Sequence, residues 1–245
     1  MACSRHLVSP VACSLASNDH HGFPLTPLPA RISVGGADTI ASMMAWWPLA
    51  MLAYPETQAR AHAELDAVVG RARLPTFADH PNLPYIRAMV KEVLRWRPIG
   101  PLGMPHRSTE DDWYEGMFIP KGTICIPNVW HMNRDPGVYG VNAAHFDPAR
   151  HLDANGRITS GVSGTKDIGH VSYGFGRRVC VGRHVADNSL FINIAVMLWA
   201  SRIERKKDAS GQLVPLDVDG FVDEGIVVLV SLSYILKWTL TRVAS

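Results

Sequence analysis

The sequence has few cysteines, and they are far apart. None belongs to a C-x-x-C pair, and the four that occur in 245 residues are Cys3, Cys13, Cys125 and Cys180. This spacing argues against a disulfide framework and favours a reducing compartment. Cys3 and Cys13 lie near His20 and His21, but the spacing matches none of the usual structural zinc patterns. We therefore expect no structural zinc site.

Charge and long apolar runs are also scarce. The net charge is +2, and no stretch concentrates Lys and Arg among aromatic residues, so we expect no nucleic-acid binding. The best apolar run, Ile226 to Leu236, is shorter than the roughly 18 residues of a membrane-spanning helix and favours a buried strand. Residues 1–30 hold four prolines and show no clear signal peptide, which predicts a poorly ordered lead.

The composition that remains is typical of a globular protein with a sizeable core, with 47% apolar residues. Residues 31–54 are apolar all round except at Asp38 and Thr39, which predicts a buried helix that Pro48 kinks or ends near Trp47. A second helix is predicted between Pro55 and Gly70. A third, over residues 84–98, has an apolar stripe at i, i+3, i+4, i+7 and i+8.

Short strands and one long helix are predicted in the rest of the chain. Residues 111–130 indicate two strands around a type I turn at residues 119–122. A long helix is predicted from about Gly182 to Arg205, and residues 211–230 indicate another hairpin. The predicted fold class is mainly α with small β hairpins.

Cys180 lies in the stretch SYGFGRRVCVG, with three glycines and two arginines around it. Positive charge, backbone amides and a helix N-terminus all stabilise a thiolate, which suits a nucleophile, a redox cysteine or a metal ligand. A small core cysteine is the alternative. A dinucleotide-binding loop is excluded because Val179 occupies the third glycine position and no acidic residue follows about 20 positions beyond Gly176.

Residues 173–182 resemble the haem-binding loop of the cytochrome P450 family, F-x-x-G-x-R-x-C-x-G. Gly176, Arg178, Cys180 and Gly182 match, and Tyr173 stands where Phe is usual. The resemblance implies that Cys180 is the axial thiolate ligand of the iron of haem b (iron protoporphyrin IX). It also implies that Arg178 hydrogen-bonds a haem propionate and that Tyr173 packs against the haem face.

Two further stretches resemble parts of the same family. Residues 35–39 resemble its distal oxygen-binding stretch, which implies that Gly36 leaves room for dioxygen, that Thr39 contacts it and that Asp38 relays protons. The alternative is that Thr39 bonds back to a carbonyl of its own helix. Residues 101–123 resemble the strand segment in which His106 contacts a propionate, although a surface histidine is an equal alternative.

Glu92 and Arg95 form an E-x-x-R motif. A helical wheel places them opposite the apolar stripe. There they would form a solvated ion pair that stabilises the helix by about 0.2–0.5 kcal/mol. The resemblance implies instead that they are buried with Arg150 of an F-x-P-x-R segment, Phe146–Arg150. Removing one of three buried charges would then cost roughly 3–5 kcal/mol.

The resemblance covers roughly residues 33–228 and is strongest to fungal microsomal members, which are much longer. Residues 31–245 are therefore expected to form a partial domain, the C-terminal half of the cytochrome P450 fold, after the lead of residues 1–30. The matching part begins midway through the distal helix, so we expect apolar surface to be exposed.

The resemblance implies a haem-thiolate monooxygenase of secondary metabolism, which inserts one oxygen atom from O2 into a small apolar organic substrate. Electrons would come from NADPH through NADPH-cytochrome reductase, docked near basic residues such as Arg177, and residues 215–226 would touch substrate. Intact relatives lie at the endoplasmic reticulum membrane. Without their anchor, this chain is expected at a membrane surface or in the cytoplasm. The alternative is a truncated, non-catalytic haem-binding or interaction fragment.

Overall fold

A computed structural model describes residues 9–10, 28–159, 161, 168–219, 222–223, 228–229 and 236–240. Most of the predicted lead, with Cys3, Cys13, His20 and His21, lies outside the described residues. The α-helices are α1 Leu28–Ala53, α2 Pro55–Val68, α3 Pro84–Trp96, α4 Val129–Met132, α5 Pro136–Tyr139 and α6 Arg183–Ala200. Three 3-10 helices are η1 Phe77–Asn82, η2 Pro148–His151 and η3 Gly176–Arg178.

The strands are short and pair antiparallel in four small sheets of the described chain. One sheet has the order β1-β2-β5, and the others pair β3 with β4, β6 with β9 and β7 with β8. Their bounds are β1 Ser9–Pro10, β2 His106–Arg107, β3 Asp112–Tyr114, β4 Met117–Ile119, β5 Ile124–Cys125, β6 Ser201–Arg205, β7 Val222–Asp223, β8 Val228–Leu229 and β9 Leu236–Leu240. The predicted fold class, mainly α with small hairpins, is confirmed.

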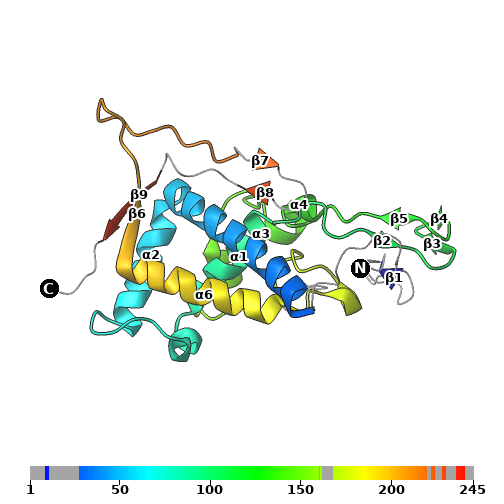
Figure 1. Cartoon of the computed structure of the whole chain (residues 1–245), viewed down its shortest axis with the longest axis horizontal. Helices are drawn as coiled ribbons and strands as arrows, with labels where there is room; N and C mark the ends of the chain where they lie inside the picture. The colour runs from blue at the N-terminus through cyan, green and yellow to red at the C-terminus, as the bar shows by residue number, and fades with distance from the viewer. Residues whose placement is uncertain are drawn as a thin grey trace.

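The core lies where α1, α2, α3 and α6 pack together (Figure 1). Aromatic rings fill its centre: the Trp96 ring lies 6.5 Å from that of Trp46 and 5.6 Å from that of Phe146, both edge to face. Such edge-to-face pairs add to the free energy gained by burying their area. No helix of the described residues is long and apolar enough to span a bilayer.

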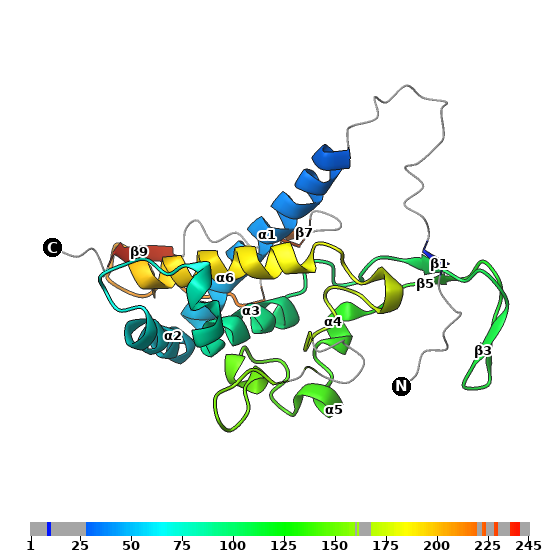
Figure 2. The same ribbon diagram turned by 90° about the horizontal axis from the view of Figure 1, so that it is seen from below.

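Helix α1 differs from its prediction in two ways. It continues through Pro48 to Ala53, so the expected end near Trp47 is wrong. Trp46, Trp47 and Leu49 are almost fully buried, and this packing holds the last turns although proline removes a helix hydrogen bond. The helix is also not buried throughout, because Asp38 is exposed and the N-terminal half extends away from the other helices (Figure 2).

The second and third helices follow their predictions closely. Helix α2 begins with Pro55 and is stopped at Gly70, whose φ of 69° favours glycine and whose N–H donates to the Leu65 carbonyl. In α3, every residue of the predicted apolar stripe is buried. The amphipathic pattern therefore located the face of α3 that packs into the core.

The predicted hairpin has its turn elsewhere. Strands β3 and β4 are joined at Glu115 and Gly116, whose φ angles are 48° and 81°, as in the two-residue turns that match strand twist. The turn near Pro120 leads instead to β5, which pairs with β2. There the Thr123 N–H donates to the Pro120 carbonyl, one residue later than expected, and Gly122 has φ 91°.

The last predicted helix is shorter than expected. Helix α6 ends at Ala200, because residues 201–205 form β6 and pair in full register with β9. In β6, Ser201 and Ile203 are buried while Arg202 and Glu204 are exposed, the alternation of a strand with one buried face. The pairing of β7 with β8 agrees with the predicted tail hairpin, and residues 226–227 and 230–235 lie outside the described residues.

Candidate functional site

Cys180 lies on a tight loop between η3 and the start of α6. The Cys180 N–H donates to the Tyr173 carbonyl at 2.8 Å, and the Gly174 N–H donates to that of Val171 at 2.9 Å. Gly174 and Gly176 have φ angles of 76° and 56°, a region that side-chain-bearing residues rarely adopt. These bonds and angles turn the loop so that Cys180 is exposed rather than buried, which rules out a core cysteine.

The surface around the thiol is open and apolar. A Cβ added at Gly174 or Gly176 would meet no described atom within 4 Å. Close by in the chain, Val181 is 94% exposed and Val185 is 66% exposed. The exposed thiol, the clearance at the glycines and the exposed apolar side chains fit a flat, largely apolar macrocycle with Cys180 as its ligand. The glycine positions supply the required clearance.

His106 supplies a second sign of fit. Its Nδ1 atom is buried and has no hydrogen-bond partner among the described residues. An unpaired buried nitrogen is costly, and a propionate oxygen would satisfy it. Figures 1 and 2 both place the sheet that contains β2 at the same end of the molecule as the loop before α6. Arg178 is exposed on that loop, and its contact with a propionate stays a prediction.

The predicted oxygen-side residues lie together on α1. The Thr39 hydroxyl donates to the Gly36 carbonyl at 3.2 Å, which is the back-bonding that sequence reasoning left as the alternative. Asp38 is exposed, and its carbonyl accepts from the Ser42 hydroxyl at 2.7 Å. A Cβ at Gly36 would meet no described atom within 4 Å, so there is space beside this turn. The catalytic roles of Asp38 and Thr39 stay predictions.

The charged cluster on α3 is largely buried. Arg95 donates to the two oxygens of Glu92 at 2.7 and 2.8 Å, and Arg150 donates to Glu92 Oε1 at 3.1 Å. Glu92 and Arg95 are 0% exposed, so the solvated pair expected from the helical wheel is wrong. Segment 133–147 covers this face of α3, and Arg95 also donates to the carbonyls of Asn133, Ala143 and His145.

His151 is a fourth member of the cluster that sequence reasoning missed, although it follows Arg150 directly. Its Nε2 lies 3.0 Å from Glu92 Oε2. Burial would raise the pKa of Glu92, but hydrogen bonds from Arg95 and His151 and the positive charge of Arg95 hold that pKa at about 2. Burial also lowers the pKa of His151 below its usual 6.5, against the pull of Glu92. The imidazole is therefore neutral at neutral pH and donates Nε2–H to the carboxylate.

Tyr173 makes a contact that phenylalanine could not make. Its hydroxyl donates to the Asp187 carboxylate at 2.7 Å, and its ring lies tilted against His170 at 5.1 Å. Burial raises the pKa of both Tyr173 and Asp187, so the phenol keeps its proton and remains the donor. The expected packing of Tyr173 on haem stays a prediction.

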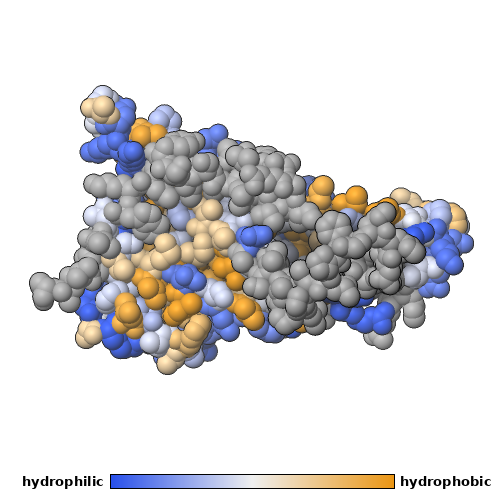
Figure 3. Space-filling model, viewed as in Figure 1, coloured by the Kyte–Doolittle hydropathy of each residue, from blue (hydrophilic) through white to orange (hydrophobic). Residues whose placement is uncertain are grey.

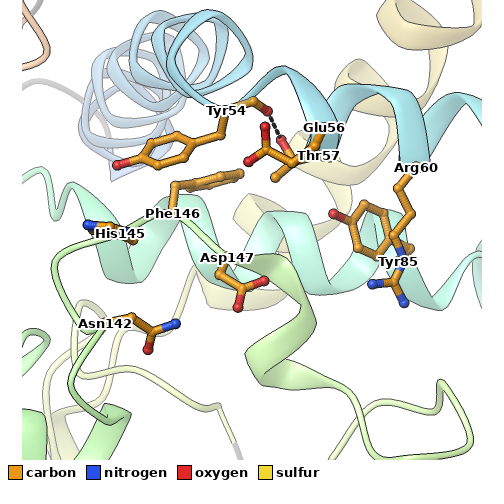
Figure 4. Close-up of a pocket in the computed structure, with 9 residues that line it drawn as sticks. All are labelled: Tyr54, Glu56, Thr57, Arg60, Tyr85, Asn142, His145, Phe146 and Asp147. Atoms are coloured by element: carbon orange, nitrogen blue, oxygen red, sulfur yellow. Dashed lines mark hydrogen bonds between the residues drawn. The ribbon is translucent and has the colours of Figure 1, made fainter.

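One surface pocket lies beside the Glu92 cluster, since Asp147 lines the pocket and its N–H donates to Glu92. Its volume is about 370 Å³, and Figure 4 shows it between the start of α2, α3 and the segment before η2. Its lining residues are Tyr54, Glu56, Thr57, Arg60, Tyr85, Asn142, His145, Phe146 and Asp147. None of the predicted site residues lines it. Within the described part of the chain, no cluster of His, Cys, Asp and Glu would hold a metal ion by itself.

Comparison with known proteins agrees with this geometry. The sequence pattern of the family described as Cytochrome P450 matches residues 29–213. A cytochrome P450 monooxygenase of Armillaria gallica is 63% identical over 200 residues, 82% of this chain and 38% of the relative. Cytochrome P450 monooxygenase 58 of Postia placenta is 54% identical over 78% of this chain and 36% of its own length. The cytochrome P450 monooxygenase iboC of Amanita muscaria is 44% identical over 71% of this chain and 39% of its own length.

These curated relatives are much longer than this chain, which spans 38% of the length of the Armillaria protein. The matched segment contains Gly36, the Glu92 cluster, His106 and the Cys180 loop. The chain belongs to the cytochrome P450 family.

Proposed function

We propose that this chain is the haem-thiolate part of a monooxygenase that inserts one oxygen atom from O2 into a small apolar organic substrate. The observation that carries the proposal is the exposed Cys180 on a glycine-rich loop with clearance beside it. Family membership supports the reaction class, because the matched relatives are named as monooxygenases. The substrate class rests on the resemblance alone.

Cys180, Arg178 and His106 would hold the haem, and two further groups would hold the segments around it. Cys180 would bind the iron, while Arg178 and His106 would pair with the propionates. The Glu92 cluster would fix segment 133–151 behind the loop, because Arg95 and Arg150 tie it to α3. At the loop itself, Arg183 donates from Nη1 to the Cys180 carbonyl at 3.1 Å, which anchors the cysteine to the first turn of α6.

Bound haem supplies the oxygen chemistry, and a cysteine thiolate ligand pushes electron density towards the iron. The residues of this chain would position that chemistry. Thr39 would exchange its bond to the Gly36 carbonyl for one to the oxygen substrate, and the exposed Asp38 would pass protons from solvent. Residues 215–219 would form part of the substrate wall, since Arg97 fixes them through the Val218 carbonyl and Asp219.

The electron donor would be NADPH through a reductase. Arg177 and Arg178 are exposed beside Cys180, and positive charge there would attract an acidic partner. A membrane-surface location would follow that of microsomal relatives, and the cytoplasm is the alternative. Fractionation of the expressing cells would separate the two.

Haem reconstitution tests the proposal. The purified chain would be titrated with haemin, reduced and exposed to carbon monoxide. We expect the Soret band of a thiolate-ligated complex, and we expect Cys180→Ser to lose it. Cys125→Ser is the matched control, because Cys125 is the other cysteine of the described residues and lies in β5. Retention of the thiolate band by Cys180→Ser would contradict the assignment of Cys180.

The second candidate is a haem-binding chain without catalysis. It is favoured by the open surface at Val181 and Val185. Incubation of the reconstituted chain with NADPH, a fungal reductase and a panel of small apolar substrates separates the two. Products that carry one oxygen from labelled O2 support the monooxygenase, whereas a thiolate band without products supports the second candidate.

A further inference from the structure

Tyr173 connects the cysteine to the helix that follows it through two different atoms. Its main-chain carbonyl accepts the Cys180 N–H at 2.8 Å. Its side-chain hydroxyl donates to the Asp187 carboxylate at 2.7 Å. Asp187 lies in the second turn of α6. One residue therefore joins the amide of the proposed ligand to the side of α6, across the turn that the glycines make possible.

We propose that the Tyr173–Asp187 hydrogen bond is a positioning contact that holds the cysteine loop in its ligand-presenting conformation before haem binds. The proposal rests on the assignment of Cys180 as the haem ligand and adds a side-chain contact that the family motif does not describe. A phenylalanine at position 173 would keep the carbonyl contact to Cys180 and lose the link to α6. This chain therefore has a hydrogen bond to α6 that phenylalanine, the usual residue of the motif at this position, cannot form.

The surroundings strengthen the Tyr173–Asp187 hydrogen bond and make the conformation of the loop depend on it. Tyr173 and Asp187 are both half-buried, and a hydrogen bond to a carboxylate shielded from water is worth more than a neutral, exposed one. Few side chains pack around residues 174–178: Gly174 and Gly176 have no described atom within 4 Å of a built Cβ, and Phe175, Arg177 and Arg178 are exposed. Packing therefore contributes little to the order of residues 174–178.

Cationic groups also act on Asp187. Lys91 on α3 and Arg183 and His184 on α6 act on it through charge. Lys91 Nζ also donates to the Ile168 carbonyl at 2.9 Å, and Arg183 donates to the Cys180 carbonyl. On the other side, the Tyr173 ring packs against the buried His170. The ring is thus held in place, and its hydroxyl is aimed at α6.

Hydrogen exchange on the haem-free full chain tests the proposal. The peptide that spans residues 171–182 would report the amides of Gly174, Arg178 and Cys180, which close the loop. We expect Tyr173→Phe and Asp187→Leu each to speed their exchange about tenfold or more, the effect of losing one hydrogen bond to a charged group. The double variant should add little to either single change, because both remove the same bond.

Three controls separate positioning from general destabilisation. Asp187→Asn keeps an acceptor oxygen and should restore much of the protection. Tyr54→Phe, whose ring lines the separate pocket (Figure 4), should leave loop exchange unchanged. Amides of α2 should exchange at the wild-type rate in every variant. Equal acceleration in α2 would show a structural role only and would overturn the proposal.

The outcomes also separate this proposal from the proposed function. Unchanged loop exchange in Tyr173→Phe overturns the positioning contact even if wild-type chain forms the thiolate complex with haem. Failure of wild-type chain to form that complex, with loop protection lost in Tyr173→Phe, leaves the hydrogen bond established and rejects the haem site. A wild-type chain whose amides are unprotected throughout rejects both.

Discussion

Glu92 is a buried carboxylate that stays charged because five donors surround it. Arg95 supplies two, and Arg150, His151 and the Asp147 N–H supply the others. Glu92→Gln keeps the volume but removes the charge that Arg95 and Arg150 need. We expect the free energy of unfolding to fall by about 3–5 kcal/mol, as when a buried charge loses its partner. Urea unfolding measures this free energy. The control is Glu110→Gln at an exposed position, which should change the free energy of unfolding by less than about 0.5 kcal/mol.

The same residue predicts a pH dependence. The pKa of Glu92 is about 2 in the folded chain, against 4.5 for an ordinary glutamate. A folded-state pKa below the unfolded value adds stability above pH 4.5, and this contribution is lost as the pH falls from 4.5 towards 2. The difference in unfolding free energy between wild type and Glu92→Gln should therefore shrink across that range. A difference that stays constant down to pH 2 would contradict the assignment.

At the scale of elements, Gln58 joins α2 to β6. Its Nε2 donates to the Ile203 carbonyl at 3.0 Å, and its Oε1 accepts the Ile203 N–H at 2.7 Å. Gln58→Leu would leave two buried main-chain groups unpaired, and we expect a loss of at least about 2 kcal/mol of stability. Faster exchange of the Ile203 amide would locate the loss. The exposed Gln212→Leu is the matched control, and equal effects of the two changes would argue against this link.

Helices α2 and α3 could be predicted because the information lies within each segment: Pro55 and Gly70 mark the ends of α2, and the apolar spacing marks the buried face of α3. The end of α6 could not, since β6 exists only through β9 and Gln58, which are distant in sequence. The burial of Glu92 was likewise invisible to a helical wheel, because segment 133–147 covers it. The family resemblance, by contrast, indicates the ion pairs of Arg95 and Arg150 with Glu92, and the role of Cys180 stays a prediction.

Some contacts of the site could be predicted from the sequence and others could not. The cluster of Glu92, Arg95 and Arg150 was predicted by resemblance and is present in the geometry. His151 and the Tyr173–Asp187 bond were missed, since a hydrogen bond between residues 14 positions apart depends on how the loop folds back on α6. Thr39 keeps its hydroxyl within its own helix, so a role in oxygen chemistry requires that bond to exchange.

At the scale of the whole molecule, apolar residues are exposed near the cysteine loop and on the sheet beside it. Val181, Val185, Met104 and Ile124 are each more than 60% exposed, and Figure 3 shows apolar surface over the region of α6 as well. Surfaces of this kind associate or bind partners. A haem seated against Cys180 would cover part of this surface, so haem binding and stability should be linked.

That linkage predicts a melting temperature that rises with haemin concentration. A ligand that binds only the folded chain stabilises it by RT ln(1 + [L]/Kd), which is about 2.7 kcal/mol at a hundredfold excess over Kd. Differential scanning fluorimetry at several haemin concentrations measures how steeply the melting temperature rises with haemin. The measurement is made on wild type, Cys180→Ser and Cys125→Ser. We expect Cys125→Ser to follow wild type and Cys180→Ser to show a smaller slope, because only the first keeps the iron ligand. Equal slopes in all three would mean that haemin adsorbs to the exposed apolar surface without coordination by Cys180, and the open loop would then be an association surface alone.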